Sequence, residues 1–316
     1  FFNFLLKLRF DRLLFLYIDH IYAMSNHLKG LLMTIFAVVI LSPDSVLIRL
    51  VEDASPEVDS WTVLFWRGAL YAVGVSTLVF LKYRSKTIEE FKNIGKGGLL
   101  IGFFSGISTG TFVFAIVYTS IANALVIIST GPIMIAIVAW VLLREKSSLV
   151  TWVSMIIVFI GIYIVMSGSI GGKSLVGDFF ALITAVMMGF TFTLTRKYKD
   201  INMVPVNAIG GLIAALIAIF MANTIAVPKE VVTYIIAMGV ILSISFSLIT
   251  IAPRYMPAAE VGMIMPLETV LGSLIAWYVI KEEPTMNALI GGSIVIVTLF
   301  LHSWYSTNQA HKLENI

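Results

Sequence analysis

The chain of 316 residues contains no cysteine, and its four histidines all lie near its two ends. Without cysteine there is no disulfide, no thiolate metal site and no cysteine nucleophile. Without an interior histidine, the sequence lacks the usual zinc ligand and the base of a catalytic triad. We therefore expect no cofactor, no metal and no enzyme of these classes.

Charge is also scarce. Only 12% of the residues are charged and 59% are hydrophobic, and the mean hydropathy is +0.98. A soluble protein carries about 25% charged residues, so this chain is predicted to have the lipid bilayer as its solvent. The net charge of +3 is interpreted as basic cytoplasmic loops, and no nucleic-acid partner is expected.

Ten apolar segments are long enough to cross a membrane, which takes about 20 residues of helix. They predict an all-α polytopic membrane protein with ten transmembrane helices and no soluble domain. The segments cover 29–50, 61–82, 97–117, 120–143, 149–168, 176–196, 203–223, 231–251, 256–280 and 286–305.

The distribution of basic residues predicts the orientation. With the N-terminus inside, 13 lysines and arginines fall in inside regions and four fall outside, leaving aside residues 1–23. Cytoplasmic loops carry this kind of excess, so both termini are predicted to be cytoplasmic. We expect a bacterial-type cytoplasmic (inner) membrane; the oligomeric state is left open.

The two halves of the chain echo each other. Gly102 and Gly106 recur 137 positions later as Gly239 and Ser243, and Arg144-Glu145 recurs as Lys281-Glu282. The first and sixth spans match at an offset of 147, for example Arg49 with Arg196. Because each half has five spans, the second half must be inverted relative to the first. The expected units are five-helix repeats over 28–168 and 175–305.

The ends of the chain are expected to lie outside these repeats. Residues 1–23 begin with Phe1 and are interrupted by five charges, too many for a spanning helix. They are interpreted as an N-terminal extension absent from the natural protein, with an interfacial amphipathic helix as the alternative. Residues 306–316 are expected to form a cytoplasmic tail.

At this point the chain resembles the drug/metabolite transporter superfamily in its EamA-type branch, over about residues 28–305. The resemblance depends on the five-plus-five spans, on Trp66-Arg67, on the stretch from Tyr118 to Glu145 and on its counterpart from Pro266 to Glu282. Many members have proline where Thr269 stands, whereas here the proline lies at Pro266. The resemblance implies a secondary carrier with a central cavity between its halves, which moves small metabolites by alternating access.

Charges inside the predicted spans indicate a functional site, because each costs about 2.5–3.5 kcal/mol at mid-helix. Asp44, Arg67 and Glu268 are such charges, and their repeat partners are uncharged. Asp44 and Arg67 either form a structural ion pair or contact substrate; Glu268 either binds a cationic group or proton, or makes an interhelical hydrogen bond. Asn123 and Thr269 complete the predicted substrate-binding set. Weaker candidates are Ser129, Thr130, Asn207 and Glu260.

These residues favour a transporter of small polar metabolites, and we expect an exporter of amino-acid-like compounds with proton coupling. One acid and one base facing a shared cavity would suit a zwitterion. A channel and a membrane-embedded enzyme are the alternatives. The pattern Gly106-x-Ser108-x-Gly110 matches a nucleophile motif, but it lies mid-span without the strand, turn and histidine that this chemistry needs.

Overall fold

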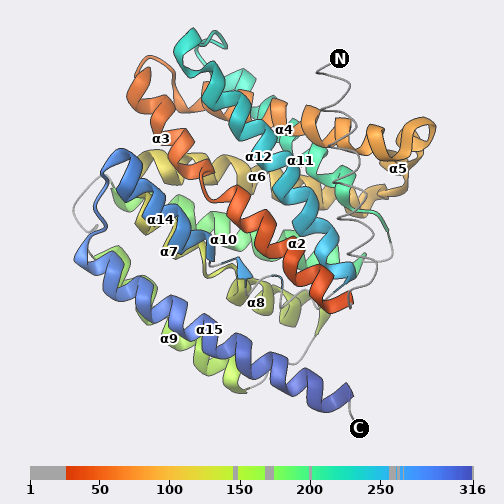
Figure 1. Ribbon diagram of the computed structural model, residues 1–316, viewed down its shortest axis with the longest axis vertical. Coiled ribbons are helices and arrows are strands. Elements are labelled where there is room, and N and C mark those ends of the chain that lie inside the picture. The colour runs from red at the N-terminus through yellow and green to blue at the C-terminus, as the bar shows by residue number, and fades with distance from the viewer. Residues whose placement is uncertain are drawn as a thin grey trace, which may run out of the picture.

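The computed structural model describes residues 26–144, 149–167, 174–198, 201–255, 261, 264–265 and 267–314, all helix or short connection without a strand. The expected extension 1–23, Glu145, Glu260 and Pro266 lie outside these residues. Figure 1 shows the helices as one bundle, with α9 and α15 side by side at its edge. The helices are α2 (Asn26–Leu41), α3 (Asp44–Ala54), α4 (Ser60–Tyr83), α5 (Thr87–Asn93), α6 (Gly95–Tyr118), α7 (Ile121–Ile128), α8 (Gly131–Leu143), α9 (Leu149–Ser167), α10 (Ser174–Lys197), α11 (Val204–Met221), α12 (Lys229–Ile251), α14 (Leu267–Ile280) and α15 (Met286–Glu314).

Seven helical segments of the described chain are long and apolar enough to cross a membrane. They coincide with seven of the ten predicted spans. Shorter apolar helices over Trp152–Val165, Leu267–Ile280 and Met286–His302 occupy the positions of the other three. The fold is therefore an all-helical, multi-pass bundle, and the count of ten spans stays a prediction.

Two of the spans are broken within their length. The first span divides into α2 and α3 at Ser42 and Pro43, since proline lacks the amide hydrogen that would continue the helix. The fourth divides into α7 and α8 at Ser129 and Thr130, just before Pro132. The hydroxyls of Ser42, Ser129 and Thr130 each donate to a carbonyl of the preceding turn. Val38 O and Ile127 O also accept backbone amides, so the hydroxyls add to the backbone bonds at the breaks, where an apolar medium supplies no water to the carbonyls.

Repeat-related helices pack against each other in opposite directions. Asp59, at the start of α4, accepts hydrogen bonds from Asn223, which follows the end of α11. Asn202, which precedes α11, donates to the hydroxyl of Tyr83 at the end of α4. Helices α9 and α15 behave likewise, because Asn287 in the first turn of α15 donates to Ile164 O in the last turn of α9. Both pairs are therefore antiparallel.

The contacts between these helices are reciprocal. A Cβ added at Gly68 would lie 2.6 Å from Gly211 O, and one added at Gly211 would lie 2.7 Å from Gly68 O. Gly161 and Gly291 show the same exchange, at 3.0 and 2.5 Å. Such small residues let membrane helices approach closely and gain van der Waals contact. In each pair, either glycine lies against the carbonyl oxygen of the other, as expected when two halves are related by a two-fold axis.

Other neighbours follow the same exchange. Helix α6 packs on α10 and α11, while its repeat partner α12 packs on α2, α3 and α4. The residues that follow α8 and α14, Arg144 and Lys281, both adopt left-handed backbone conformations with φ of 54° and 57°. A left-handed residue at this position is a common way for a helix to end. The predicted echo is thus visible in local backbone geometry as well as in sequence.

Candidate functional site

A cavity lies between the two halves, lined by α2, α3, α4, α6 and α7 from the first and by α10, α11, α12 and α14 from the second. Its volume is about 80 Å³. It reaches from the Asp44–Arg67 region to Arg196 at the end of α10. The cavity is central, and both halves contribute to its wall.

Asp44 and Arg67 form a buried ion pair at one end of this cavity. Arg67 Nη2 lies 2.6 Å from Asp44 Oδ2, and Arg67 Nε lies 3.5 Å from Asp44 Oδ1. Asp44 is 0% and Arg67 3% exposed, and the guanidinium carbon lies 5.0 Å from the centroid of the Phe112 ring. The ion pair that the sequence offered as one possibility is therefore formed, and each charge is largely neutralised by the other.

Glu268 lies in the first turn of α14 and lines the same cavity. This position suits a carboxylate, because the start of a helix carries a partial positive charge. Its side chain makes no hydrogen bond and no ion pair with any residue of the described chain, although the Asp44–Arg67 pair is within electrostatic reach. It is the cavity's carboxylate without a fixed partner.

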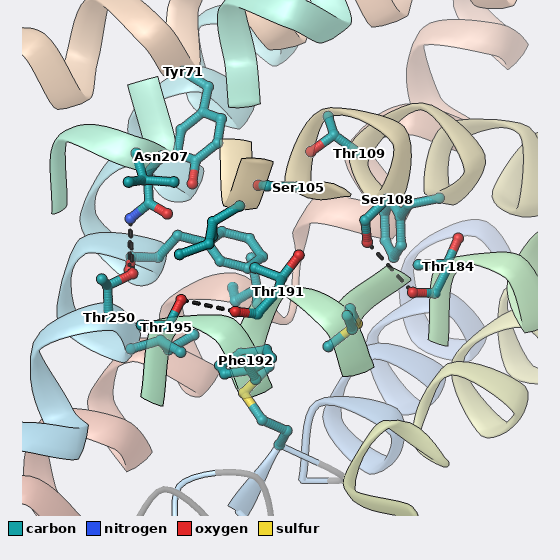
Figure 2. A pocket seen from close by; sticks show the side chains of 18 of the residues that line it. Tyr71, Ser105, Ser108, Thr109, Thr184, Thr191, Phe192, Thr195, Asn207 and Thr250 are labelled. Atoms are coloured by element: carbon teal, nitrogen blue, oxygen red, sulfur yellow. Dashed lines mark hydrogen bonds between the residues drawn. The ribbon is translucent and has the colours of Figure 1, made fainter. Parts of the chain in front are cut away.

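The rest of the wall is mostly apolar, with serine and threonine hydroxyls set into it that the sequence analysis did not single out. Figure 2 shows Ser105, Ser108 and Thr109 from α6 across the cavity from Thr191 and Thr195 of α10. Residues 191 and 195 are one helical turn apart and share a face, which is the signal that could have found them. Serine and threonine in apolar spans more often bond to their own helix, so the pattern alone was not selective.

The two weaker members of the predicted site lie elsewhere. Asn123 is buried in the first turn of α7, and its backbone amide is capped by the hydroxyl of Ser120. Thr269 donates to Leu125 O at 3.0 Å and joins α14 to α7. Neither residue lines the central cavity. Asn207, a weaker candidate, does line it and bonds to α12. A role of Asn123 or Thr269 in binding stays a prediction.

A second polar network closes the helix ends beyond Asp44. Arg49 of α3 donates through Nη2 to Ile116 O at 2.6 Å and to Thr119 O at 2.7 Å, where α6 ends. Its Nε lies 3.7 Å from Glu282 Oε2, just after α14. Glu282 Oε1 in turn accepts from the amide of Ile121, at the start of α7. Arg49 thus joins the first half of the chain to the second.

Among the described residues, no group of three or more histidine, aspartate or glutamate side chains could hold a metal ion. The polar groups of the cavity are instead dispersed over helices of both halves. This arrangement can hold a small polar molecule through several separate hydrogen bonds. It defines a membrane protein whose cavity takes polar side chains from both halves.

Comparisons with known proteins identify the class. The model of the EamA-like transporter family matches residues 28–167 and again 175–304. A protein of Methanothermobacter thermautotrophicus described as an uncharacterized transporter is 21% identical over 197 residues, covering 59% of this chain and 57% of that protein. Another so described, from Clostridium kluyveri, is 26% identical over 272 residues, covering 78% and 85%.

A solved crystal structure shares the fold, with a TM-score of 0.65 and 14% identity over 90% of this chain and 98% of that one. The family match covers most of the chain in two copies, so the chain belongs to the EamA-like transporter family. It is a multi-pass membrane transporter of the drug/metabolite kind. The family and these relatives indicate a transporter rather than an enzyme.

Proposed function

We propose that the protein is a ten-span secondary transporter that moves small polar metabolites by alternating access through the central cavity. The observation that carries this proposal is a central cavity that takes polar side chains from both halves, together with an ion pair between Arg49 and Glu282 that joins the halves. In transporters built from repeated halves, one half rocks against the other around a fixed central site. The antiparallel, reciprocal packing of α4 with α11 and of α9 with α15 supports an inverted repeat.

The Arg49 network defines the closed side in this proposal. Arg49 and Glu282 bond the ends of α3, α6, α7 and α14 to one another. The cavity extends the other way, to Arg196, which is the repeat partner of Arg49. With cytoplasmic termini in a bacterial-type inner membrane, the structure then corresponds to a state that is closed outside and directed inward.

The proposed cargo is amino-acid-like and the proposed direction is export. The hydroxyls of the wall, the unpartnered carboxylate of Glu268 and the small cavity support a compact polar solute. Glu268 is also the proposed proton-coupling group, because it is the cavity carboxylate with no fixed partner among the described residues. Proton-coupled flux should be uncoupled from a pH gradient in Glu268→Gln; flux that stays fully coupled in this variant rejects the role.

Counterflow in proteoliposomes tests the function itself. Vesicles loaded with an unlabelled amino-acid mixture should transiently accumulate radiolabelled amino acids above equilibrium, because a carrier exchanges solutes through one site. A channel gives equilibration without this overshoot, so its absence, with labelled solute still entering, supports the channel instead. Empty liposomes and protein inactivated by heat give the baseline.

A further inference from the structure

We propose that the central cavity selects its cargo by a primary ammonium group, so that an amine without a carboxylate binds while the matching carboxylic acid does not. This inference rests on the proposed transport function and narrows its substrate class. It differs from the expectation in the sequence analysis that one acid and one base in the cavity together bind a zwitterion. The reasons are the pairing of the charges in the cavity and the direction of the hydrogen bonds along its wall.

The first reason is charge. Asp44 neutralises the charge of Arg67 through contacts to Nε and Nη2, and the Phe112 ring lies 5.0 Å from the guanidinium carbon, which leaves only Nη1 without a hydrogen bond among the described residues. Arg196, at the far end of the cavity, has an interaction of its own. Glu268 alone among the described carboxylates of the cavity has no bonding partner. When Glu268 is ionised, a cationic group at this place gains a charge-assisted hydrogen bond, whereas an anion meets an uncompensated like charge.

The second reason is the direction of the wall's hydrogen bonds. The hydroxyl of Thr191 donates to Met187 O at 2.9 Å, and that of Thr195 donates to Thr191 O at 2.8 Å. A hydroxyl has one hydrogen, so each of these groups is left with acceptor capacity only. Both side chains are half-buried and line the cavity (Figure 2).

Asn207 and Thr250 repeat this arrangement on the neighbouring helices. Asn207 Nδ2 donates to Phe246 O at 3.1 Å and to Thr250 Oγ1 at 2.8 Å, so both amide hydrogens are used. Thr250 itself donates to Phe246 O. The amide oxygen of Asn207 and the remaining lone pair of Thr250 Oγ1 can therefore only accept. The wall formed by α10, α11 and α12 presents acceptors, and an ammonium with three hydrogens is its complement.

Hydroxyls on the opposite wall, such as Ser105 and Thr109, can donate or accept and fit either partner. They accommodate the rest of the cargo without deciding its charge. Selectivity is thus assigned to Glu268 together with Thr191 and Thr195.

A matched set of ligands tests this assignment on the purified full chain. Leucine, 3-methylbutylamine and 4-methylpentanoate share one branched chain and differ in whether they carry the ammonium, the carboxylate or both. Binding is measured by calorimetry in lipid nanodiscs, which avoids the free diffusion of the uncharged amine across membranes. We expect leucine and the amine to bind with affinities within about tenfold of each other, and the acid to bind at least tenfold more weakly than the amine.

Three variants separate recognition from folding. Glu268→Gln should weaken the binding of 3-methylbutylamine by roughly 10- to 100-fold, which is the contribution of one hydrogen bond to a charged group. Thr191→Val and Thr195→Val should each weaken the binding of the amine by roughly 3- to 10-fold and leave the affinity for 4-methylpentanoate unchanged. Thr77→Val is the matched control, because Thr77 makes the same bond to its own helix on an exposed face of α4.

Equal binding of the acid and the amine overturns the proposal, and so does an unchanged preference in Glu268→Gln. Failure of all three ligands to bind a folded protein also overturns it. Each of these results leaves the transport function standing if counterflow of another solute is found. Loss of transport altogether, with the ligand preference intact, would instead reject the transport function and keep the ammonium site.

Discussion

Breaking the Asp44–Arg67 pair is the most quantitative test of how the cavity is built. Both side chains are almost fully buried and are joined at 2.6 Å. Asp44→Asn or Arg67→Met leaves one buried charge without its partner, which costs about 3–5 kcal/mol of stability. The double variant removes both charges and keeps most of the volume, so its cost should fall below about 2 kcal/mol, since replacing a whole buried pair is often nearly neutral.

Unfolding in mixed micelles with increasing denaturing detergent, followed by tryptophan fluorescence, measures these free energies. Arg254→Gln is the control for loss of an arginine, because Arg254 is exposed and, within the described part of the chain, donates a hydrogen bond only to Ile201 O. The cost of this substitution in unfolding free energy should stay below about 1 kcal/mol. Additive costs of Asp44→Asn and Arg67→Met in the double variant would refute the ion pair as a structural unit.

Other predictions concern the helix contacts and the cap of α4. Gly68→Ala should destabilise the protein by about 1–3 kcal/mol in the same assay, because its Cβ would lie 2.6 Å from a backbone oxygen of α11. Gly110→Ala is the control and should be tolerated, because its Cβ would meet only a side-chain carbon at 3.4 Å. Equal costs of the two substitutions would reject the close packing of α4 on α11. Burial alone would raise the pKa of Asp59, but hydrogen bonds from Thr62 and Asn223 outweigh it and hold the pKa below its usual value of 3.8. A lowered pKa stabilises the fold above pH 3.8, and this contribution is lost as the pH falls through the folded pKa. Asp59→Asn should therefore lower stability at neutral pH and flatten the acid limb of the stability profile; an unchanged acid limb contradicts this reasoning.

Much of the fold was predictable because a membrane leaves few choices. The length of a span, the basic residues of its loops and the small residues at repeated positions are all local signals. The break at Pro43 also has a local cause, since proline removes a helix hydrogen bond whatever the tertiary context. The helix at Thr87–Asn93, inside the charged connection after the second span, was not predicted. It is short, and short helices depend on packing rather than on their own propensity.

The site was predictable only in part. Asp44 and Arg67 were found because charge is rare in a span, and their depth placed them at a similar level. The Arg49 network was not predicted, because Arg49 bonds to the backbone carbonyls of Ile116 and Thr119, and any residue type has such a carbonyl. The acceptor wall was missed for a related reason. Whether a threonine faces a cavity or a neighbouring helix depends on how distant segments pack, and that is absent from a local pattern.

The accessibility of the cavity from each side tests the central claim most directly. The chain has no cysteine, so Thr109→Cys provides a single thiol inside the cavity (Figure 2). In oriented vesicles, a membrane-impermeant thiol reagent should label it from the Arg196 side. Adding Arg49→Gln, which weakens the closing network, should raise labelling from the opposite side and lower it from the first. Equal labelling from both sides without Arg49→Gln, or no change when it is added, would contradict alternating access.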